Sequence, residues 1–307
     1  MKKVQVRIED RELTLSNLDK VFWPDKNVVK GELINYYREV APYLLPHLKD
    51  RPLTMNRFPD GITGKNFYQK DCPESAPDWV TTVPVASGEK SGEKKVINYV
   101  LADQTATLVW LANLGCIEMH PWLAPYQRSE YPQVMVFDLD PNEGTGLKEV
   151  LKIAPLINEA LTQFGVKGFA KTSGASGLHI YVPLEPKYTY KQVQHAAKTI
   201  AGAVARLLPD IATLERTVIK RGPRLYLDCL QNASGKTIAS VYSLRPHPGA
   251  PVSFPVSWDL VEQGRVDPLE YDIYQVPRIL RKEGDLFRET LTLRQNIDKI
   301  LNFKTFK

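Results

Sequence analysis

One apolar run that ends in two carboxylates constrains this chain more than any other stretch. Residues 134–137 (Val-Met-Val-Phe) lead into Asp138, Leu139 and Asp140, and residues 141–144 (Pro-Asn-Glu-Gly) follow as a turn signal. A run of β-branched and aromatic residues that stops at such a turn is typical of a buried central strand. The sequence therefore predicts a core strand with an acidic end.

Side-chain alternation places Asp138 and Asp140 on the same face of that strand. Their Cα atoms should lie about 6 to 7 Å apart, because a strand rises about 3.3 Å per residue. Carboxylates at this spacing can bracket two divalent ions about 3.5 to 4 Å apart, the arrangement used in phosphoryl and nucleotidyl transfer. Taken alone, the pair could instead begin a turn or form ion pairs with nearby basic residues.

Composition limits the class of protein. The 307 residues, 43% of them hydrophobic, suffice for one large core or two modest ones. A net charge of +5 permits a polyanionic partner without requiring one. The three cysteines show no paired spacing, which argues against a disulfide framework and a structural zinc site. Without an apolar N-terminal segment or a run approaching about 18 apolar residues, we expect a cytoplasmic protein that is neither exported nor membrane-spanning.

A loop of small residues follows the acidic strand further along the chain. A strand over residues 168–172 enters the Ser-Gly-Ala-Ser-Gly sequence of residues 173–177, and a second strand leaves over residues 178–182 with His179 near its start. Small residues let backbone N–H groups and hydroxyls approach a triphosphate closely. The same pattern would also suit a tight hairpin that binds nothing.

A third polar position ends another apolar strand, predicted over residues 225–229. Asp228 lies near its end and is a natural third metal carboxylate beside Asp138 and Asp140. Residues 231–237 resemble the tail of a phosphate-binding P-loop. Leu230 stands where that motif requires its first glycine, so we reject a P-loop.

The N-terminal part of the sequence predicts a hairpin and two helices, with Lys20 and Lys30 beside them. Residues 4–15 alternate as a hairpin, and residues 16–17 (Ser-Asn) then predict the cap of a short helix. An amphipathic helix should begin near Lys30 and end at Pro42. Lys20 and Lys30, considered singly, suit solvated surface positions.

Two adjacent aromatics, Phe67 and Tyr68, lie between Lys65 and Lys70. This combination suits base stacking and phosphate contact on single-stranded nucleic acid. Alternatively, one ring packs in the core.

The other predicted elements follow from periodicity and turn signals. His120, on one of the predicted strands, is on its own more typical of a structural histidine than of a ligand. The predicted strands are 51–58, 80–86, 96–100, 116–122 and 238–244, with an exposed hairpin loop at Glu89 to Lys95 and Arg245 at the end of the last strand; the predicted helices are 103–115, 147–164, 190–208 and 278–302.

Taken together, three motifs resemble those of the archaeo-eukaryotic primase superfamily, and in particular the polymerase domain of bacterial DNA ligase D. They are residues 137–141, residues 171–179, and Leu227-Asp228 with Gln231-Asn232. The likeness extends from Asn17 to about Trp258. Further matching stretches are residues 51–54, 67–70, 242–245 and 249–253.

The resemblance implies an α/β (α+β) fold, with a primase-like catalytic core whose mixed β-sheet is flanked by helices. It implies template-directed nucleotide addition at DNA ends and at gaps with a 5′-phosphate, a preference for ribonucleotides over deoxynucleotides, and two Mn²⁺ (or Mg²⁺) ions per site. It also implies a nucleoid-associated enzyme that works with Ku and a separate DNA ligase in non-homologous end joining.

The same resemblance assigns roles to individual residues. The metal-binding and catalytic triad would be Asp138, Asp140 and Asp228. The nucleotide would be held by Lys171, Ser173, Gly174, His179, Arg221, Gln231, Arg245 and His120. The 5′-phosphate pocket would be Asn17, Lys20 and Lys30, and the template-stacking pair would be Phe67 and Tyr68.

One position departs from this family pattern. Ser176 stands where relatives often have a lysine, which could weaken triphosphate binding unless Lys171 compensates. No Lys-x-Asp-Gly ligase motif occurs either, so we expect a stand-alone polymerase.

We expect a single domain over residues 1–307. It would comprise a DNA-gripping lobe to about residue 130, a catalytic core to about 258 and a helical extension beyond. Two alternatives remain. A haloacid-dehalogenase-like phosphatase would share the Asp-x-Asp motif but expects Thr or Val at Asn142. A catalytically idle nucleic-acid-binding module of the same fold would lack metal-dependent turnover.

Overall fold

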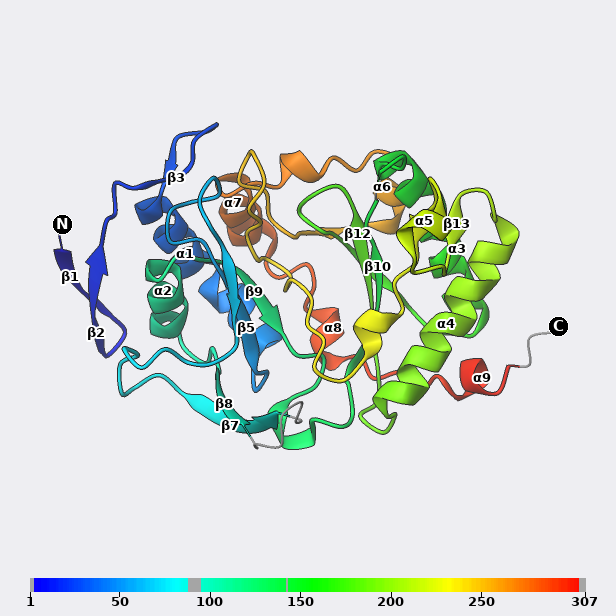
Figure 1. Ribbon diagram of the computed structural model, residues 1–307, viewed down its shortest axis with the longest axis horizontal. Coiled ribbons are helices and arrows are strands. Elements are labelled where there is room, and N and C mark those ends of the chain that lie inside the picture. The colour runs from blue at the N-terminus through cyan, green and yellow to red at the C-terminus, as the bar shows by residue number, and fades with distance from the viewer. Residues whose placement is uncertain (1–2, 88–94, 142, 304–307) are drawn as a thin grey trace. The chain divides into compact units, whose positions relative to one another are not determined.

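The computed structural model describes residues 3–87, 95–141 and 143–303, and the chain forms two compact units. The first unit contains residues 1–127, 237–252 and 270–285; the second contains residues 128–236, 253–269 and 286–307. Figure 1 follows the chain from the blue N-terminus to the red C-terminus. Each unit therefore combines segments that are far apart in the sequence.

The first unit opens with the predicted hairpin. Strands β1 (Lys3–Ile8) and β2 (Arg11–Ser16) pair antiparallel, with Val4 opposite Leu15. Leu13 and Leu15 are buried while Thr14 between them is exposed, as the alternating pattern requires. This prediction is confirmed.

The short helix predicted after residues 16–17 is wrong. Asn17 adopts the left-handed conformation (φ +56°), which breaks a regular helix, and the chain turns into strand β3 (Val21–Trp23). Strand β4 (Val28–Val29) pairs with β3 and leads directly into helix α1 (Lys30–Leu48).

Helix α1 also continues past Pro42, where the sequence predicted its end. A proline inside a helix removes one backbone hydrogen bond. Leu44 and Leu48, beyond that proline, are fully buried. Burial of these apolar side chains outweighs the lost bond, so the helix persists to Leu48.

A three-stranded antiparallel sheet carries the candidate site residues Phe67, Tyr68 and His120 of the first unit. Its order is β6 (Phe67–Gln69), β5 (Leu53–Arg57) and β9 (Cys116–Pro121). Helices α1 and α2 (Thr105–Asn113) pack against each other, and α2 leads into β9. These strands and α2 confirm the predictions for 51–58, 116–122 and 103–115.

Further elements complete the first unit. Strands β7 (Thr82–Ser87) and β8 (Lys95–Val100) pair antiparallel as predicted, and the loop predicted between them lies almost entirely outside the described residues. The short element η1 (Tyr126–Arg128) follows β9 in the chain.

The predicted strand over residues 238–244 is wrong. Tyr242 has φ +62°, which a continuous strand cannot contain. Buried contacts hold this conformation: the Tyr36 hydroxyl donates to the Tyr242 carbonyl at 2.8 Å, and the Tyr242 hydroxyl donates to Asp285 Oδ1 at 2.7 Å. Arg245 consequently follows a turn.

The second unit is organised around an antiparallel four-stranded sheet. Its order is β10 (Val134–Leu139), β12 (Leu178–Pro183), β11 (Phe169–Thr172) and β15 (Pro255–Val256). The first three strands confirm the predicted strands, but the predicted central position of the strand before Asp138 is wrong, because β10 lies at the edge of the sheet. The register places both Asp138 and Lys171 directly opposite His179.

Two amphipathic helices pack with this sheet and with each other. They are α3 (Leu147–Gln163) and α4 (Tyr190–Leu207), both close to the predicted bounds. The strand predicted over 225–229 is shorter, because β14 (Leu225–Tyr226) pairs in parallel with β13 (Ala212–Thr213) for only two residues. The short elements are α5 (Val218–Arg221), η2 (Leu230–Asn232), α6 (Trp258–Glu262) and η3 (Pro268–Glu270).

The single helix predicted over residues 278–302 is wrong. The chain instead forms α7 (Gln275–Glu283), α8 (Glu289–Thr292) and α9 (Asp298–Leu301). Gly284, with φ +76°, ends α7 in a conformation that glycine adopts readily. None of the helices in the described part of the chain is long and apolar enough to cross a membrane.

Candidate active site

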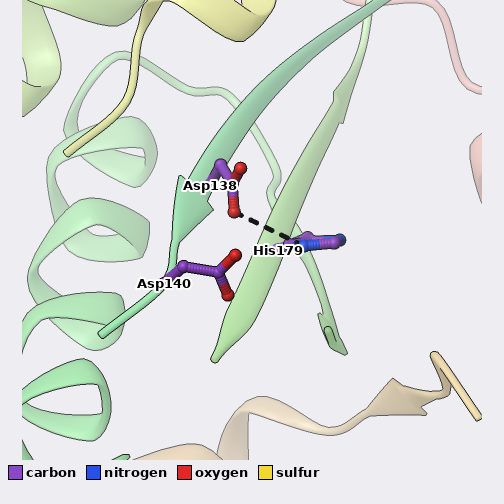
Figure 2. A group of neighbouring side chains, drawn as sticks. All are labelled: Asp138, Asp140 and His179. Carbon is purple, nitrogen blue, oxygen red and sulfur yellow. Dashed lines mark ion pairs between the residues drawn. The ribbon is translucent and has the colours of Figure 1, made fainter. Parts of the chain in front are cut away.

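Two carboxylates and a histidine meet at the end of β10, in the second unit (Figure 2). Asp138 lies on β10, Asp140 follows the end of that strand, and His179 lies on β12. One ligand atom from each residue lies within 4.8 Å of the others. We call Asp138, Asp140 and His179 the acidic group.

The acidic group has the donor set of a divalent-cation site. Carboxylate oxygens suit Mg²⁺ and Mn²⁺, and imidazole is also a common metal ligand. Asp138 Oδ1 lies 3.4 Å from His179 Nε2, while Gln231 Nε2 donates to Asp138 Oδ2 at 3.3 Å. Asp140 is exposed. The residues therefore fit a metal ion at this position.

The small-residue loop after β11 approaches the acidic group closely. A Cβ added at Gly177 would lie 2.4 Å from Asp140 Oδ1 and 2.5 Å from the Leu139 carbonyl. Such distances are far below van der Waals contact, so a larger residue would displace the carboxylate or the loop. Glycine at position 177 is therefore required by the contact between the loop and Asp140.

Hydrogen bonds within this loop fix its shape. Ser173 Oγ accepts from the backbone N–H groups of Ala175 (3.2 Å) and Gly177 (3.1 Å), and Gly174 takes φ +77°. Ser173 itself is fully buried. The loop is thus formed by its own contacts, with Ser176 in its middle.

Lys171 lies behind His179. Its side chain is fully buried, and Nζ lies 2.8 Å from His179 Nδ1 and donates to Ser253 Oγ at 2.5 Å. Lys171 is therefore placed to orient the imidazole.

Asp228 and Asn232 are joined to β10 by other contacts. Asp228 N donates to the Asp138 carbonyl at 3.4 Å, and Asp228 Oδ1 accepts from Leu230 N at 2.7 Å. The buried Asn232 amide accepts from Val136 N (2.8 Å) and donates to Val136 O (2.7 Å), so it replaces a neighbouring strand. Asp228 lies beside Asp138 but is not among the residues within 4.8 Å.

Arg221 is held within its own loop. Its Nε donates to the Glu215 carbonyl at 3.2 Å, a terminal nitrogen donates to the Arg216 carbonyl at 2.8 Å, and the guanidinium lies over the Tyr226 ring at 4.4 Å.

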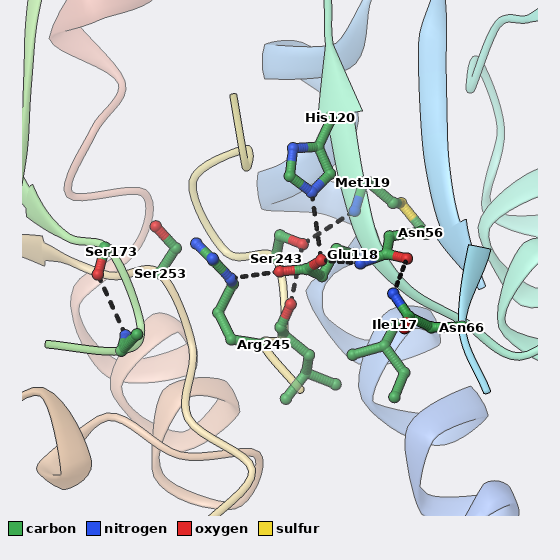
Figure 3. Close-up of polar contacts among 12 residues, drawn as sticks. Asn56, Asn66, Ile117, Glu118, Met119, His120, Ser173, Ser243, Arg245 and Ser253 are labelled. Carbon is green, nitrogen blue, oxygen red and sulfur yellow. Dashed lines mark hydrogen bonds and ion pairs between the residues drawn. The ribbon is translucent and has the colours of Figure 1, made fainter. Parts of the chain in front are cut away.

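In the first unit, a buried carboxylate joins two residues that sequence analysis assigned to the nucleotide (Figure 3). Glu118 Oε1 lies 2.5 Å from Arg245 Nε, and Oε2 lies 3.4 Å from His120 Nε2. Asn56 Nδ2 also donates to Oε2. We call Glu118, Asn56, His120 and Arg245 the Glu118 cluster.

Sequence analysis did not single out Glu118 as functional. One signal was present, because Glu118 and His120 alternate as the polar residues of an otherwise apolar strand and thus share a face. Ser253 and the strand-like role of Asn232 were also missed, since both depend on partners far away in the sequence.

The two predicted stacking residues are exposed rather than packed in the core. Phe67 is 45% exposed and Tyr68 is 61% exposed, which rules out the core alternative. The Arg57 guanidinium lies over the Phe67 ring at 5.2 Å, and the Tyr68 ring meets His120 edge-on at 5.7 Å.

Asn17, Lys20 and Lys30 gather at the start of α1. Asn17 O accepts from Lys20 N at 3.0 Å, and Lys30 N donates to the Lys20 carbonyl at 2.8 Å. The Lys20 ammonium pairs with Asp60, whereas Lys30 is buried and donates to the Ser16 carbonyl at 2.7 Å. Burial and the charge of Lys20 lower the pKa of Lys30 to about 8.

Comparisons with known proteins agree on one family. The model of the LigD primase-polymerase domain matches residues 29–287. The bifunctional non-homologous end joining protein LigD of Bacillus subtilis (strain 168) is 33% identical over 276 residues, covering 89% of this chain and 43% of the relative. The LigD protein of Mycobacterium bovis is 30% identical over 285 residues, covering 90% of this chain and 37% of the relative.

A solved structure agrees as well. The polymerase domain of Mycobacterium tuberculosis ligase D in complex with DNA matches with a TM-score of 0.83 and 27% identity, covering 92% of this chain and 99% of that one. The chain spans less than half the length of the LigD relatives named above.

The fold and these matches place the chain among the DNA-directed nucleotidyltransferases. It belongs to the LigD primase-polymerase domain family. This membership removes the haloacid-dehalogenase alternative, whose resemblance was limited to the Asp-x-Asp motif.

Proposed function

We propose that this protein adds nucleotides to DNA ends under the direction of a template, filling gaps during non-homologous end joining. The observation that carries the proposal is the acidic group beside the small-residue loop, in a chain of the LigD primase-polymerase family. We further propose that the protein prefers ribonucleotides and that residues 1–307 act as one catalytic domain.

Two divalent ions, Mn²⁺ or Mg²⁺, would be held by Asp138, Asp140 and Asp228. When bound, such ions lower the pKa of an attacking hydroxyl and offset the negative charge of a triphosphate. The oxygen-rich donor set around Asp138 supports this assignment.

The other side chains would bind and orient the nucleotide. The loop that begins at Ser173-Gly174 would receive the triphosphate through backbone N–H groups, and His179, oriented by Lys171, would contact it from β12. Further contacts to the nucleotide would come from Arg221, Gln231, His120 and Arg245.

The DNA would be recognised in the first unit. Asn17, Lys20 and Lys30 would bind a 5′-phosphate at the gap, because two ammonium groups and the N-terminus of α1 favour an anion. The exposed rings of Phe67 and Tyr68 would stack on template bases. The DNA complex of the Mycobacterium tuberculosis domain supports a DNA substrate here. We also propose that the protein is nucleoid-associated and acts with Ku and a DNA ligase.

The proposal is tested by extending a labelled primer across a gap in duplex DNA with Mn²⁺. Wild-type protein should add nucleotides, with NTPs favoured over dNTPs and a 5′-phosphate at the gap favoured over a 5′-hydroxyl. Asp228→Ala should abolish addition while the protein remains folded and binds DNA. A wild type that binds DNA but adds nothing would instead identify a catalytically idle module.

A further inference from the structure

Glu118 is a buried acid whose two carboxylate oxygens contact three different side chains. The residue is 2% exposed on β9, and its partners come from β5 (Asn56), from β9 itself (His120) and from the segment after Tyr242 (Arg245). Asn66 Nδ2 donates to Asn56 Oδ1 at 3.1 Å and extends the network. One carboxylate thus joins three parts of the first unit.

The carboxylate must be charged for this arrangement to hold. Burial alone would raise the pKa of Glu118, but contact with His120, the charge of Arg245 and the Asn56 hydrogen bond lower it to about 2. The ionised carboxylate therefore faces Arg245 and His120 throughout the neutral range. Removing a buried partner of this kind leaves the opposite charge without compensation.

The contact with Arg245 uses one particular edge of the guanidinium. Nε faces Glu118 Oε1, and Figure 3 shows the terminal nitrogens pointing away from Glu118. Guanidinium groups bind phosphate through paired, planar N–H donors, so the direction of that plane decides whether both donors reach the anion. Glu118 contacts the guanidinium at Nε and leaves the terminal nitrogens pointing elsewhere.

The backbone around Arg245 is held without the Glu118 side chain. Arg245 N donates to the Pro251 carbonyl at 2.9 Å, Leu244 N donates to the Tyr37 hydroxyl at 3.1 Å, and Met119 N donates to Ser243 Oγ at 3.1 Å. The carboxylate is therefore not needed to place the segment. Its contacts act on the Arg245 and His120 side chains.

We propose that Glu118 is a positioning residue for the incoming triphosphate: it holds Arg245 and His120 in the orientation that binds the phosphates. The inference rests on the proposed function, because it takes those two residues as nucleotide contacts. It adds a carboxylate whose contribution to nucleotide binding is indirect.

The test compares Glu118→Gln with wild type and with Met119→Leu, a control at the neighbouring buried position on the opposite face of β9. Binding of a fluorescent ATP analogue with Mn²⁺, without DNA, is measured first, followed by KM and kcat for NTP addition. Glu118→Gln should bind the analogue about tenfold more weakly or worse, and its KM should rise more than its kcat falls. Met119→Leu should match wild type in both measurements.

Two further variants separate positioning from a structural role. In an Arg245→Ala, His120→Ala background, Glu118→Gln should change analogue binding by less than about twofold, because the residues it orients are gone. Arg245→Lys keeps the positive charge but replaces the planar guanidinium by a single ammonium group, so it should weaken binding much as Glu118→Gln does, and it tests the inference even if Glu118→Gln fails to fold.

Specific outcomes would overturn the inference. Unchanged analogue binding in Glu118→Gln or in Arg245→Lys would do so, as would an equal loss in the background that lacks both partners. These outcomes are distinct from failure of the proposed function, which wild-type protein would show by binding the analogue without adding nucleotides to a primer.

Discussion

The acidic group and the Glu118 cluster use carboxylates in opposite ways. Asp140 is exposed and the Asp138 side chain keeps 13% of its surface accessible, whereas the Glu118 side chain keeps only 3%. In the acidic group, two carboxylates meet one imidazole. In the Glu118 cluster, one carboxylate meets an arginine, a histidine and an amide. The first arrangement can accept a cation from solution, while the second already contains the Arg245 guanidinium.

The comparison indicates which carboxylate can be substituted with an effect on activity but little effect on stability. A carboxylate in a vacant ligand site contributes little to folding. Removing its charge even relieves its repulsion with the neighbouring carboxylate in the ligand-free protein. A carboxylate that pairs with a buried cation contributes to both folding and function. Activity and thermal stability, measured together, therefore distinguish the two regions.

The largest effect is expected from neutralising the acidic group. Asp138→Asn should reduce templated addition by about a thousandfold or more, because the oxygen ligands of the metal lose their charge. Mn²⁺ binding, followed by electron paramagnetic resonance, should fall in parallel while the melting temperature stays within a few degrees. Asp10→Asn, on the exposed turn after β1, serves as a control with wild-type behaviour. Retained Mn²⁺ binding in Asp138→Asn would contradict the assignment.

A smaller effect is expected from the loop that borders the acidic group. Gly177→Ala should lower activity by about a hundredfold, because its Cβ would meet Asp140 Oδ1 and the Leu139 carbonyl. Gly165→Ala is a matched control, since a Cβ there meets nothing within 4 Å, although its φ of +73° costs some stability. Similar activity losses in the two variants would show that the contact at Gly177 is unimportant.

The rings bordering the Glu118 cluster should affect DNA binding without affecting stability. Phe67→Ala and Tyr68→Ala should each weaken binding of gapped DNA about tenfold, since base stacking contributes about 1 to 3 kcal/mol per base. Both rings are substantially exposed, so thermal unfolding should change little. A large loss of stability with unchanged DNA affinity would identify a packing role instead.

The smallest effect is expected at Lys30. This buried residue lies near another positive charge, Lys20, whereas Arg245 pairs with the carboxylate of Glu118. Burial and the Lys20 charge lower its pKa to about 8, so Lys30 is charged below that pH and neutral above it. The preference for a gap 5′-phosphate over a 5′-hydroxyl should therefore fall a few-fold as pH rises from about 7 to about 9.5. Lys30→Arg should keep the preference over that range. A preference independent of pH in wild type would argue against Lys30 as a phosphate ligand.

Local sequence patterns predicted the elements that hold the acidic group. The apolar run before Asp138, the small-residue loop and the strong apolar periodicity of α3 and α4 each depend on neighbours in the sequence, and all four correspond to observed elements. Side-chain alternation also predicted that Asp138 and Asp140 lie close together, and they do, although Asp140 lies just beyond the strand.

Long-range contacts explain what the sequence could not predict. Tyr242 interrupts an apparent strand because Tyr36 and Asp285, far away in the chain, hold it at positive φ. Asn232 pairs with Val136 as a strand would, across 96 positions. Helix α1 continues beyond Pro42 because Leu44 and Leu48 are buried. Apolar periodicity in the sequence does not show how completely a side chain will be buried. The roles of these residues depend on the tertiary fold.

The most direct measurement of the central claim is single-nucleotide addition across a gap by wild-type protein with Mn²⁺, using each of the four NTPs against each of the four template bases. We predict that the complementary nucleotide is added in every case and strongly favoured over the other three. Addition that ignores the template base, or no addition by folded protein that binds the DNA, would contradict a template-directed polymerase.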